Sequence, residues 1–108
     1  MAEREPTGEA YCAVDVVTED GIPVVRLSGE LDMVSMERVR PVVEEVLAAG
    51  NDRLAFDVRE LEFMDSSGVA LLDSATRKAR QVELRHPTPI VRRLIELTGL
   101  TELLLVVP

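Results

Sequence analysis

The sequence predicts an α/β fold, in which one mixed β-sheet has helices packed against it in the order ββαβαβαβ. Three observations support this prediction. The chain has 108 residues, which suits one compact domain. Short apolar, β-branched runs alternate with three segments whose apolar residues recur at helical spacing. Strand–helix–strand successions require parallel neighbours, whereas the two opening strands form an antiparallel hairpin.

The opening hairpin is predicted from two apolar runs, residues 12–17 and 22–27, that flank a short polar segment. Within that segment Asp20-Gly21 supplies the positive φ angles that a tight hairpin turn needs. We therefore expect the chain to begin its domain with two antiparallel strands.

The first helix is predicted between Ser35, a candidate N-cap, and Gly50, a candidate residue just past the C-terminus. Its apolar residues recur with helical periodicity, at Val39, Val42, Val43, Val46 and Leu47. Pro41 conflicts with a helix that starts at Ser35, because its ring would clash with the carbonyl four residues earlier. Either the helix starts late or it bends at Pro41.

The middle of the chain predicts a strand over residues 54–58, followed by Leu61 and Phe63 as expected anchors in the core. A second helix is predicted from after Asp65 to about Arg80. Its apolar face is expected to consist of Val69, Leu72, Ala75 and Ala79.

The last third predicts a short strand over residues 81–85, a third helix and a final strand over residues 103–107. Thr88 can cap this helix, Pro89 suits its first position, and Gly99 can close it. Its apolar face is expected to consist of Ile90, Val91, Leu94, Ile95 and Leu97.

Composition excludes several function classes. The formal net charge of −8 would repel phosphate backbones and anionic lipid, so we expect neither nucleic acid nor membrane as a partner. Cys12 is the only cysteine, which rules out a disulfide framework. Residues 1–10 are polar without a signal-peptide pattern, and the longest apolar run, residues 103–107, is too short to span a bilayer. We expect a cytoplasmic protein with a flexible tail over residues 1–10 and one domain over residues 11–108.

The stretch FMDSSG, residues 63–68, places two serines where a strand passes into a helix. A hydrolase built on Ser66 is one hypothesis, but the nucleophile elbow G-x-S-x-G is absent because neither serine has a glycine two positions earlier. The single histidine, His86, lies in a turn, so no evident base supports a serine nucleophile. Metal-ligand spacings and glycine-rich phosphate loops are also absent. We expect no enzyme, no metal site and no cofactor.

A helix start offers two other uses for these hydroxyls. Four backbone N–H groups lack intrahelical partners there, and one Ser or Asp oxygen satisfies one of them for about 0.5–2 kcal/mol. The same free N–H groups and the helix dipole also stabilise an anion, so a serine here can carry a phosphate. Phosphorylation adds about −1.5 to −2 charges, which on a partner-facing surface would switch binding off and leave the fold intact. From the residues alone, cap and switch both remain open.

Three stretches carry a resemblance to a known family: GELD at 29–32, LAFDVRELEFMDSSGVALL at 54–72 and VRRLIELTGL at 91–100. On these residues the chain from Tyr11 to Pro108 resembles a STAS domain, specifically the bacterial anti-sigma factor antagonists. The fold of that family agrees with the strand and helix order predicted above. The resemblance implies a protein-binding switch in transcription regulation, in stress response or sporulation.

In such a switch the unphosphorylated antagonist binds an anti-sigma factor that is also a serine kinase, and binding releases a sigma factor. The kinase phosphorylates the antagonist, which dissociates, and a separate phosphatase resets it. The resemblance implies that Ser66 is the phosphate acceptor, with Ser67 as the alternative acceptor or otherwise the helix cap. It also implies partner-facing roles for Asp32, near the acceptor and the nucleotide site of the partner, for Asp65, which shapes the loop, and for Gly68, which allows close backbone approach.

The sequence departs from the pattern of the family at three places. The family usually has a longer, glycine-containing turn between the second helix and the following strand, whereas here the turn near residues 80–82 is short. The first helix has Pro41 in place of an earlier proline, and Val69 replaces a leucine. One alternative keeps the fold but makes the protein a STAS adaptor in a stressosome-like or lipid-transport complex, with the serine only as a helix cap. We expect a monomer or weak dimer.

Overall fold

A computed structural model describes residues 12–108, and the expected N-terminal tail lies outside the described residues. Five strands form one sheet in the order β1-β2-β3-β4-β5, antiparallel between β1 and β2 and parallel elsewhere. This confirms the mixed sheet and the order ββαβαβαβ. The elements are β1 (Cys12–Glu19), β2 (Ile22–Leu31), α1 (Met36–Ala48), β3 (Arg53–Met64), α2 (Ser66–Lys78), β4 (Gln81–Arg85), α3 (Pro89–Thr98), the 3-10 turn η1 (Leu100–Glu102) and β5 (Leu105–Val107).

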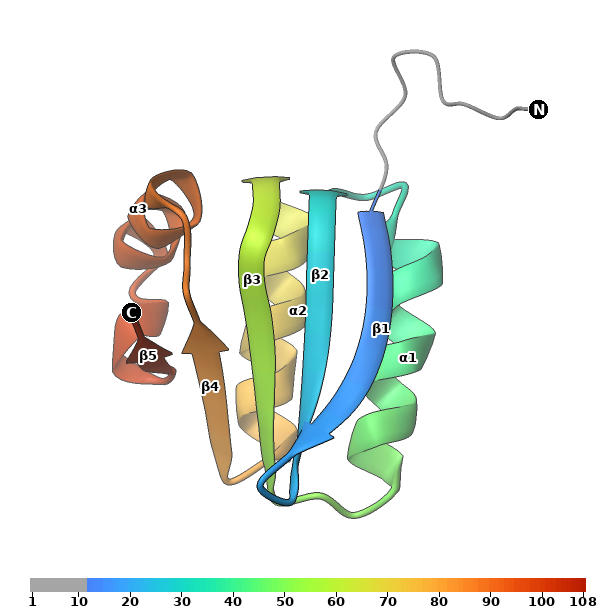
Figure 1. The fold of residues 1–108 in the computed structure, drawn as a ribbon. Helices are drawn as coiled ribbons and strands as arrows, with labels where there is room; N and C mark the ends of the chain where they lie inside the picture. The colour runs from blue at the N-terminus through green and yellow to red at the C-terminus, as the bar shows by residue number, and fades with distance from the viewer. Residues whose placement is uncertain (1–11) are drawn as a thin grey trace, which may run out of the picture.

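Figure 1 shows α1 and α2 side by side against one face of the sheet, with α3 beyond the C-terminal end of strand β4. Within the described residues, no helix covers the opposite face, which we call the helix-free face. The main core lies between the sheet and the helices. No helix in residues 12–108 is long and apolar enough to cross a membrane.

The β1–β2 hairpin has the predicted turn. Asp20 and Gly21 adopt φ angles of 53° and 78°, and Glu19 pairs directly with Ile22 on either side of them. Both strands are longer than the apolar runs suggested, and β2 continues into the GELD stretch and ends at Leu31.

Helix α1 begins at Met36, so the late start that Pro41 suggested is wrong, and Pro41 lies exposed inside the helix. Gly50 follows the helix with a φ of 85°, as predicted. Ser35 precedes the helix, but within the described residues its side chain makes no capping hydrogen bond to α1. Ser35 therefore occupies the predicted N-cap position, but its side chain does not cap the helix, because its hydroxyl bonds elsewhere, as described below.

Strand β3 is twelve residues long and carries two β-bulges against β2. Each bulge adds one residue to β3, so two successive side chains point away from the helices before the inward alternation resumes. Across the bulges the inward positions are therefore Val58 and Leu61, both fully buried, and Met64, which is 3% exposed, whereas Phe63 is 44% exposed. The prediction that Phe63 anchors the core is wrong because the second bulge shifts its side chain outward.

Helix α2 ends at Lys78, and only Ala79 and Arg80 connect it to β4. The short turn therefore shortens the helix by two residues relative to the prediction and leaves the strand as expected.

Helix α3 starts and ends as predicted, since the Thr88 hydroxyl accepts a hydrogen bond from the backbone N–H of Val91 and Gly99 adopts a φ of 80°. Its predicted apolar face is partly wrong, because Ile90 is 58% exposed and Leu97 67% exposed. The final strand is shorter than predicted because η1 occupies the chain just before it.

Candidate functional site

The GELD turn and the DSSG helix start meet at the carboxyl ends of β2 and β3. Leu31 pairs with Met64 in the sheet, and the backbone N–H of Asp65 donates to the carbonyl oxygen of Leu31 at 3.1 Å. We call residues 29–35 and 63–68 together the switch edge. The structure thus brings Asp32 and the two serines to one edge of the sheet.

Asp65 caps helix α2. Its backbone is extended, and its Oδ1 accepts a hydrogen bond from the N–H of Ser67 at 2.8 Å. The expectation that Ser67 caps this helix is therefore wrong, because Ser67 lies inside the helix and supplies the N–H that is capped. Asp and Ser are about equally good caps, so the residue that precedes the first helical turn takes the role.

Ser66 is the first residue of α2 and is exposed, whereas Ser67 is only partly exposed. Among residues 12–108, no hydrogen bond involves the Ser66 hydroxyl. The cap is already supplied by Asp65, so the Ser66 oxygen is chemically available at a helix N-terminus, where an anion is favoured.

Asp32 and Ser35 hold the β2–α1 turn by reciprocal hydrogen bonds. The N–H of Ser35 donates to Asp32 Oδ1 at 2.9 Å, and the N–H of Asp32 donates to Ser35 Oγ at 2.9 Å. The Ser35 hydroxyl in turn faces the carbonyl oxygens of Glu30 and Asp32, at 3.2 and 3.1 Å. Ser35 is 7% exposed, so this buried hydroxyl anchors the turn. The sequence did not reveal this role, because a serine before a helix is equally typical of a cap.

Gly68 is buried where α2 crosses the end of the sheet. A Cβ at this position would lie 2.5 Å from Met64 Cγ and 3.0 Å from Leu31 Cδ2. The close approach that the glycine permits is thus to side chains of its own chain, and it seats the start of α2 on β2 and β3.

The surface of the switch edge combines apolar and acidic side chains. Met33, Val34 and Phe63 are 71%, 74% and 44% exposed. The carboxylates at this edge are those of Glu30, Asp32 and Asp65, and Glu62 directly precedes it. Neither residues 29–35 nor residues 63–68 contain a basic side chain. An apolar centre with acidic neighbours is a suitable surface for a protein partner that carries complementary charge.

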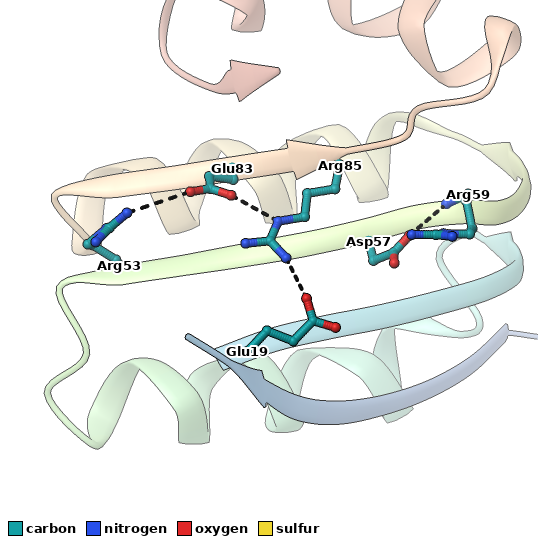
Figure 2. Close-up of polar contacts among 6 residues, drawn as sticks. All are labelled: Glu19, Arg53, Asp57, Arg59, Glu83 and Arg85. Atoms are coloured by element: carbon teal, nitrogen blue, oxygen red, sulfur yellow. Dashed lines mark hydrogen bonds and ion pairs between the residues drawn. The ribbon is translucent and has the colours of Figure 1, made fainter. Parts of the chain in front are cut away.

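A second polar cluster lies on the helix-free face (Figure 2). Arg85 donates to Glu83 at 2.9 Å and reaches Glu19 at 2.8 Å, while Arg53 lies 3.8 Å from the other oxygen of Glu83. The hydrogen bond with Glu83 raises the pKa of Arg85 above its ordinary value. Every charge in this chain of ion pairs has a partner, which indicates a structural role.

A small apolar group lies on the same face, with Val17 packed against it. Ile22, Val24 and Ala55 are 8%, 1% and 0% exposed, although no helix of the described chain lies over them. The long stems of arginine and glutamate can bury apolar surface while their charged ends stay near water.

A groove of about 690 Å³ continues along the helix-free face. It is lined by two ion pairs, Asp15 with Arg26 at 2.7 Å and Asp57 with Arg59 at 3.2 Å. The side chain of Asp57 also accepts the N–H of Arg59, which satisfies the backbone at the first bulge of β3. These charges are neutralised within the fold, and the described residues contain no group of His, Cys, Asp or Glu that could hold a metal ion.

Comparison with known proteins gives consistent matches. The family model described as Mlab, STAS domain, matches residues 14–107. Among curated proteins, an anti-sigma F factor antagonist from Lysinibacillus sphaericus is 32% identical over 92 residues, covering 81% of this chain and 78% of that protein. Among solved structures, an anti-sigma factor antagonist from Mycobacterium paratuberculosis is 30% identical with a TM-score of 0.85, covering 91% of this chain and 86% of that chain.

The anti-sigma factor antagonist SpoIIAA matches in two states. Its unphosphorylated form is 26% identical with a TM-score of 0.76 and covers 89% of each chain. The phosphorylated form of SpoIIAA from Bacillus is 26% identical with a TM-score of 0.70, covering 89% of this chain and 92% of that chain.

Proposed function

We propose, from the premise that this chain belongs to the STAS-domain family of anti-sigma factor antagonists, that it is a partner switch controlled by phosphate on Ser66. In its unphosphorylated form the protein binds an anti-sigma factor that is also a serine kinase, and a sigma factor is released. The kinase phosphorylates Ser66, the complex separates, and a phosphatase restores the binding form. We place this cycle in the cytoplasm.

The observation that carries the proposal is that the cap and the free hydroxyl at the start of α2 belong to different residues. Asp65 caps the helix, which leaves the exposed Ser66 hydroxyl without a hydrogen bond among the described residues. A helix N-terminus favours an added phosphate, and Ser66 is exposed, so modification requires no unfolding. The similarity to SpoIIAA in both its unphosphorylated and phosphorylated forms supports a fold that tolerates the change.

The switch edge supports the effect of phosphate on binding. The exposed side chains of Met33, Val34 and Phe63 offer apolar contact area to the partner. A phosphate on Ser66 adds about −1.5 to −2 charges to an edge that already carries three carboxylates, those of Glu30, Asp32 and Asp65. Binding would then require the removal of water from a strongly hydrated dianion, which weakens the complex.

The test uses the protein as bait in lysate of its source cells, with Ser66→Ala, Ser66→Asp and the matched control Ser67→Ala. We expect the Ser66→Ala protein to retain a serine kinase and the Ser66→Asp protein to lose it with an unchanged circular dichroism spectrum. Ser67→Ala should bind and become phosphorylated like the wild type. Equal capture by both Ser66 variants would contradict the proposal. Absence of phosphate on Ser66 under every growth condition would favour the adaptor role instead.

A further inference from the structure

The buried hydroxyl of Ser35 makes no hydrogen bond to α1, the helix that it precedes. The first N–H of α1, that of Met36, donates to the carbonyl oxygen of Asp32 at 3.1 Å. The Ser35 side chain is instead directed back into the GELD turn, where its oxygen meets the N–H of Asp32 and the carbonyl oxygens of Glu30 and Asp32. The Ser35 hydroxyl, at 7% exposure, thus accepts one backbone N–H and directs its single proton toward two backbone carbonyl oxygens of the turn.

The same pair fixes the Asp32 carboxylate. Its Oδ1 accepts the N–H of Ser35 at 2.9 Å, which orients the side chain relative to the turn. Within the described residues no hydrogen bond or ion pair involves Asp32 Oδ2. The hydrogen bond to Oδ1 therefore holds the Asp32 carboxylate in one orientation, while Oδ2 remains available.

The turn is also joined to the phosphate acceptor. Leu31, directly before Asp32, accepts the N–H of Asp65 at 3.1 Å. Asp65 in turn caps α2 through Ser67, so Ser66 stands between two residues that this network fixes. Hydrogen bonds thus connect the GELD turn to the backbone that carries Ser66.

We propose that Ser35 is a positioning residue for phosphate transfer to Ser66, acting through the Asp32 turn and Asp65. This inference rests on the proposed function. In the transfer, the Ser66 oxygen forms a bond to the γ-phosphorus of a nucleoside triphosphate held by the kinase, the bond to the diphosphate breaks, and the hydroxyl proton passes to water. Ser35 touches none of these atoms. It holds the acceptor and the Asp32 carboxylate in the geometry in which the transfer is fast.

The direct test measures phosphorylation kinetics of Ser35→Ala with the kinase captured by the bait experiment. We expect kcat to fall about 10- to 100-fold, because displacement of a reacting group by about 1 Å has effects of this size. KM should change less than about twofold, because the exposed docking side chains of the switch edge are retained. Ser35→Thr, which keeps the hydroxyl, should restore kcat to within about threefold of the wild type.

The matched control is Asn51→Ala at the other end of α1. It removes a side-chain hydrogen bond to the carbonyl oxygen of Val46 at 2.9 Å, far from the switch edge. We expect it to leave kcat and KM unchanged although it also loses a hydrogen bond. If Ser35→Ala does not fold, Ser35→Cys replaces it, because a thiol of similar size is a poor hydrogen-bond partner.

The outcomes separate this inference from the function on which it rests. Wild-type kcat in Ser35→Ala, together with loss of phosphorylation in Ser66→Ala, would overturn the positioning role and leave the switch intact. Phosphorylation that persists in Ser66→Ala would overturn the switch itself. If kcat falls in Ser35→Ala and is also low in Ser35→Thr, the effect comes from altered packing and the hydroxyl does not have the proposed role. Faster hydrogen exchange at the Asp32 and Asp65 amides of Ser35→Ala, but not of Asn51→Ala, is the result expected independently of any kinase.

Discussion

Replacement of Arg85 by alanine should destabilise the fold by about 2–3 kcal/mol. The exposed ion pair with Glu19, whose side chain is 54% exposed, accounts for about 1 kcal/mol at most. The larger loss comes from Glu83, whose side chain is 11% exposed and would lose its hydrogen-bonded cation. A buried charged group without its partner costs about 1–3 kcal/mol, and Arg53, at 3.8 Å, would compensate for only part of this cost.

The assay is urea unfolding at pH 7, followed by circular dichroism. With a slope of about 1.5 kcal/mol/M, the midpoint should fall by about 1.3–2 M. Glu19→Gln, which removes only the exposed contact, should cost less than about 1 kcal/mol. The double variant Glu83→Leu with Arg85→Met should recover most of the stability, because an apolar pair of similar size replaces a buried ion pair at little cost. If Arg85→Ala is no more destabilising than Glu19→Gln, Glu83 does not depend on Arg85 and the reasoning is wrong.

Three further predictions concern the start of α2 and the β1–β2 hairpin. Gly68→Ala should destabilise by about 1–2 kcal/mol in urea unfolding, because a Cβ only 2.5 Å from a buried side-chain carbon costs more than the gain in helix propensity; a stabilised variant would show that this packing adapts. Asp65→Ala should cost about 1 kcal/mol and Ser67→Ala less than about 0.5 kcal/mol, and the reverse order would make Ser67 the cap after all. The hydrogen bond from Arg26 holds the pKa of Asp15 below its ordinary 3.8, so this pair stabilises the fold above about pH 4, and the stabilisation is lost as the pH falls through the lowered pKa. In Arg26→Met, an NMR titration should show the pKa of Asp15 returning toward 3.8. An unchanged pKa would contradict the pairing.

Much of the fold was predictable because its signals are local. Thr88, Pro89 and Gly99 mark the ends of α3 through backbone preferences that act within one turn of helix, and the structure places all three as predicted. The hairpin at Asp20-Gly21 is equally local, since two positive φ angles suffice to define it.

The errors arise where several residues can perform the same local task. Asp65 and Ser67 are both good caps, and only the exact start of α2 decides between them. Ser35 is well suited to cap α1, but the course of the turn directs its hydroxyl toward Asp32. Composition and spacing do not contain this information, because it depends on backbone direction.

Other features depend on contacts between distant parts of the chain. Glu19 and Arg85 are 66 positions apart, and their contact exists only because the sheet brings the end of β1 across from β4. The outward position of Phe63 depends on a bulge against β2, which the alternation within β3 alone does not reveal. Both features follow from strand register, and register is a property of the whole sheet.

The two bulges of β3 compensate for one another along the chain. Each extra residue moves the side chains that follow it in β3 to the opposite face of the sheet. The second extra residue returns them to their original face, and in that register Leu31 pairs with Met64. A deletion of one residue between Val58 and Met64 would move the buried side chains at the end of β3 to the outer face and the exposed ones to the core. A deletion of two residues would keep the faces but withdraw the Ser66 helix start from the GELD turn. Homologous chains with this switch edge should therefore tolerate substitutions in this stretch far more readily than any change in its length.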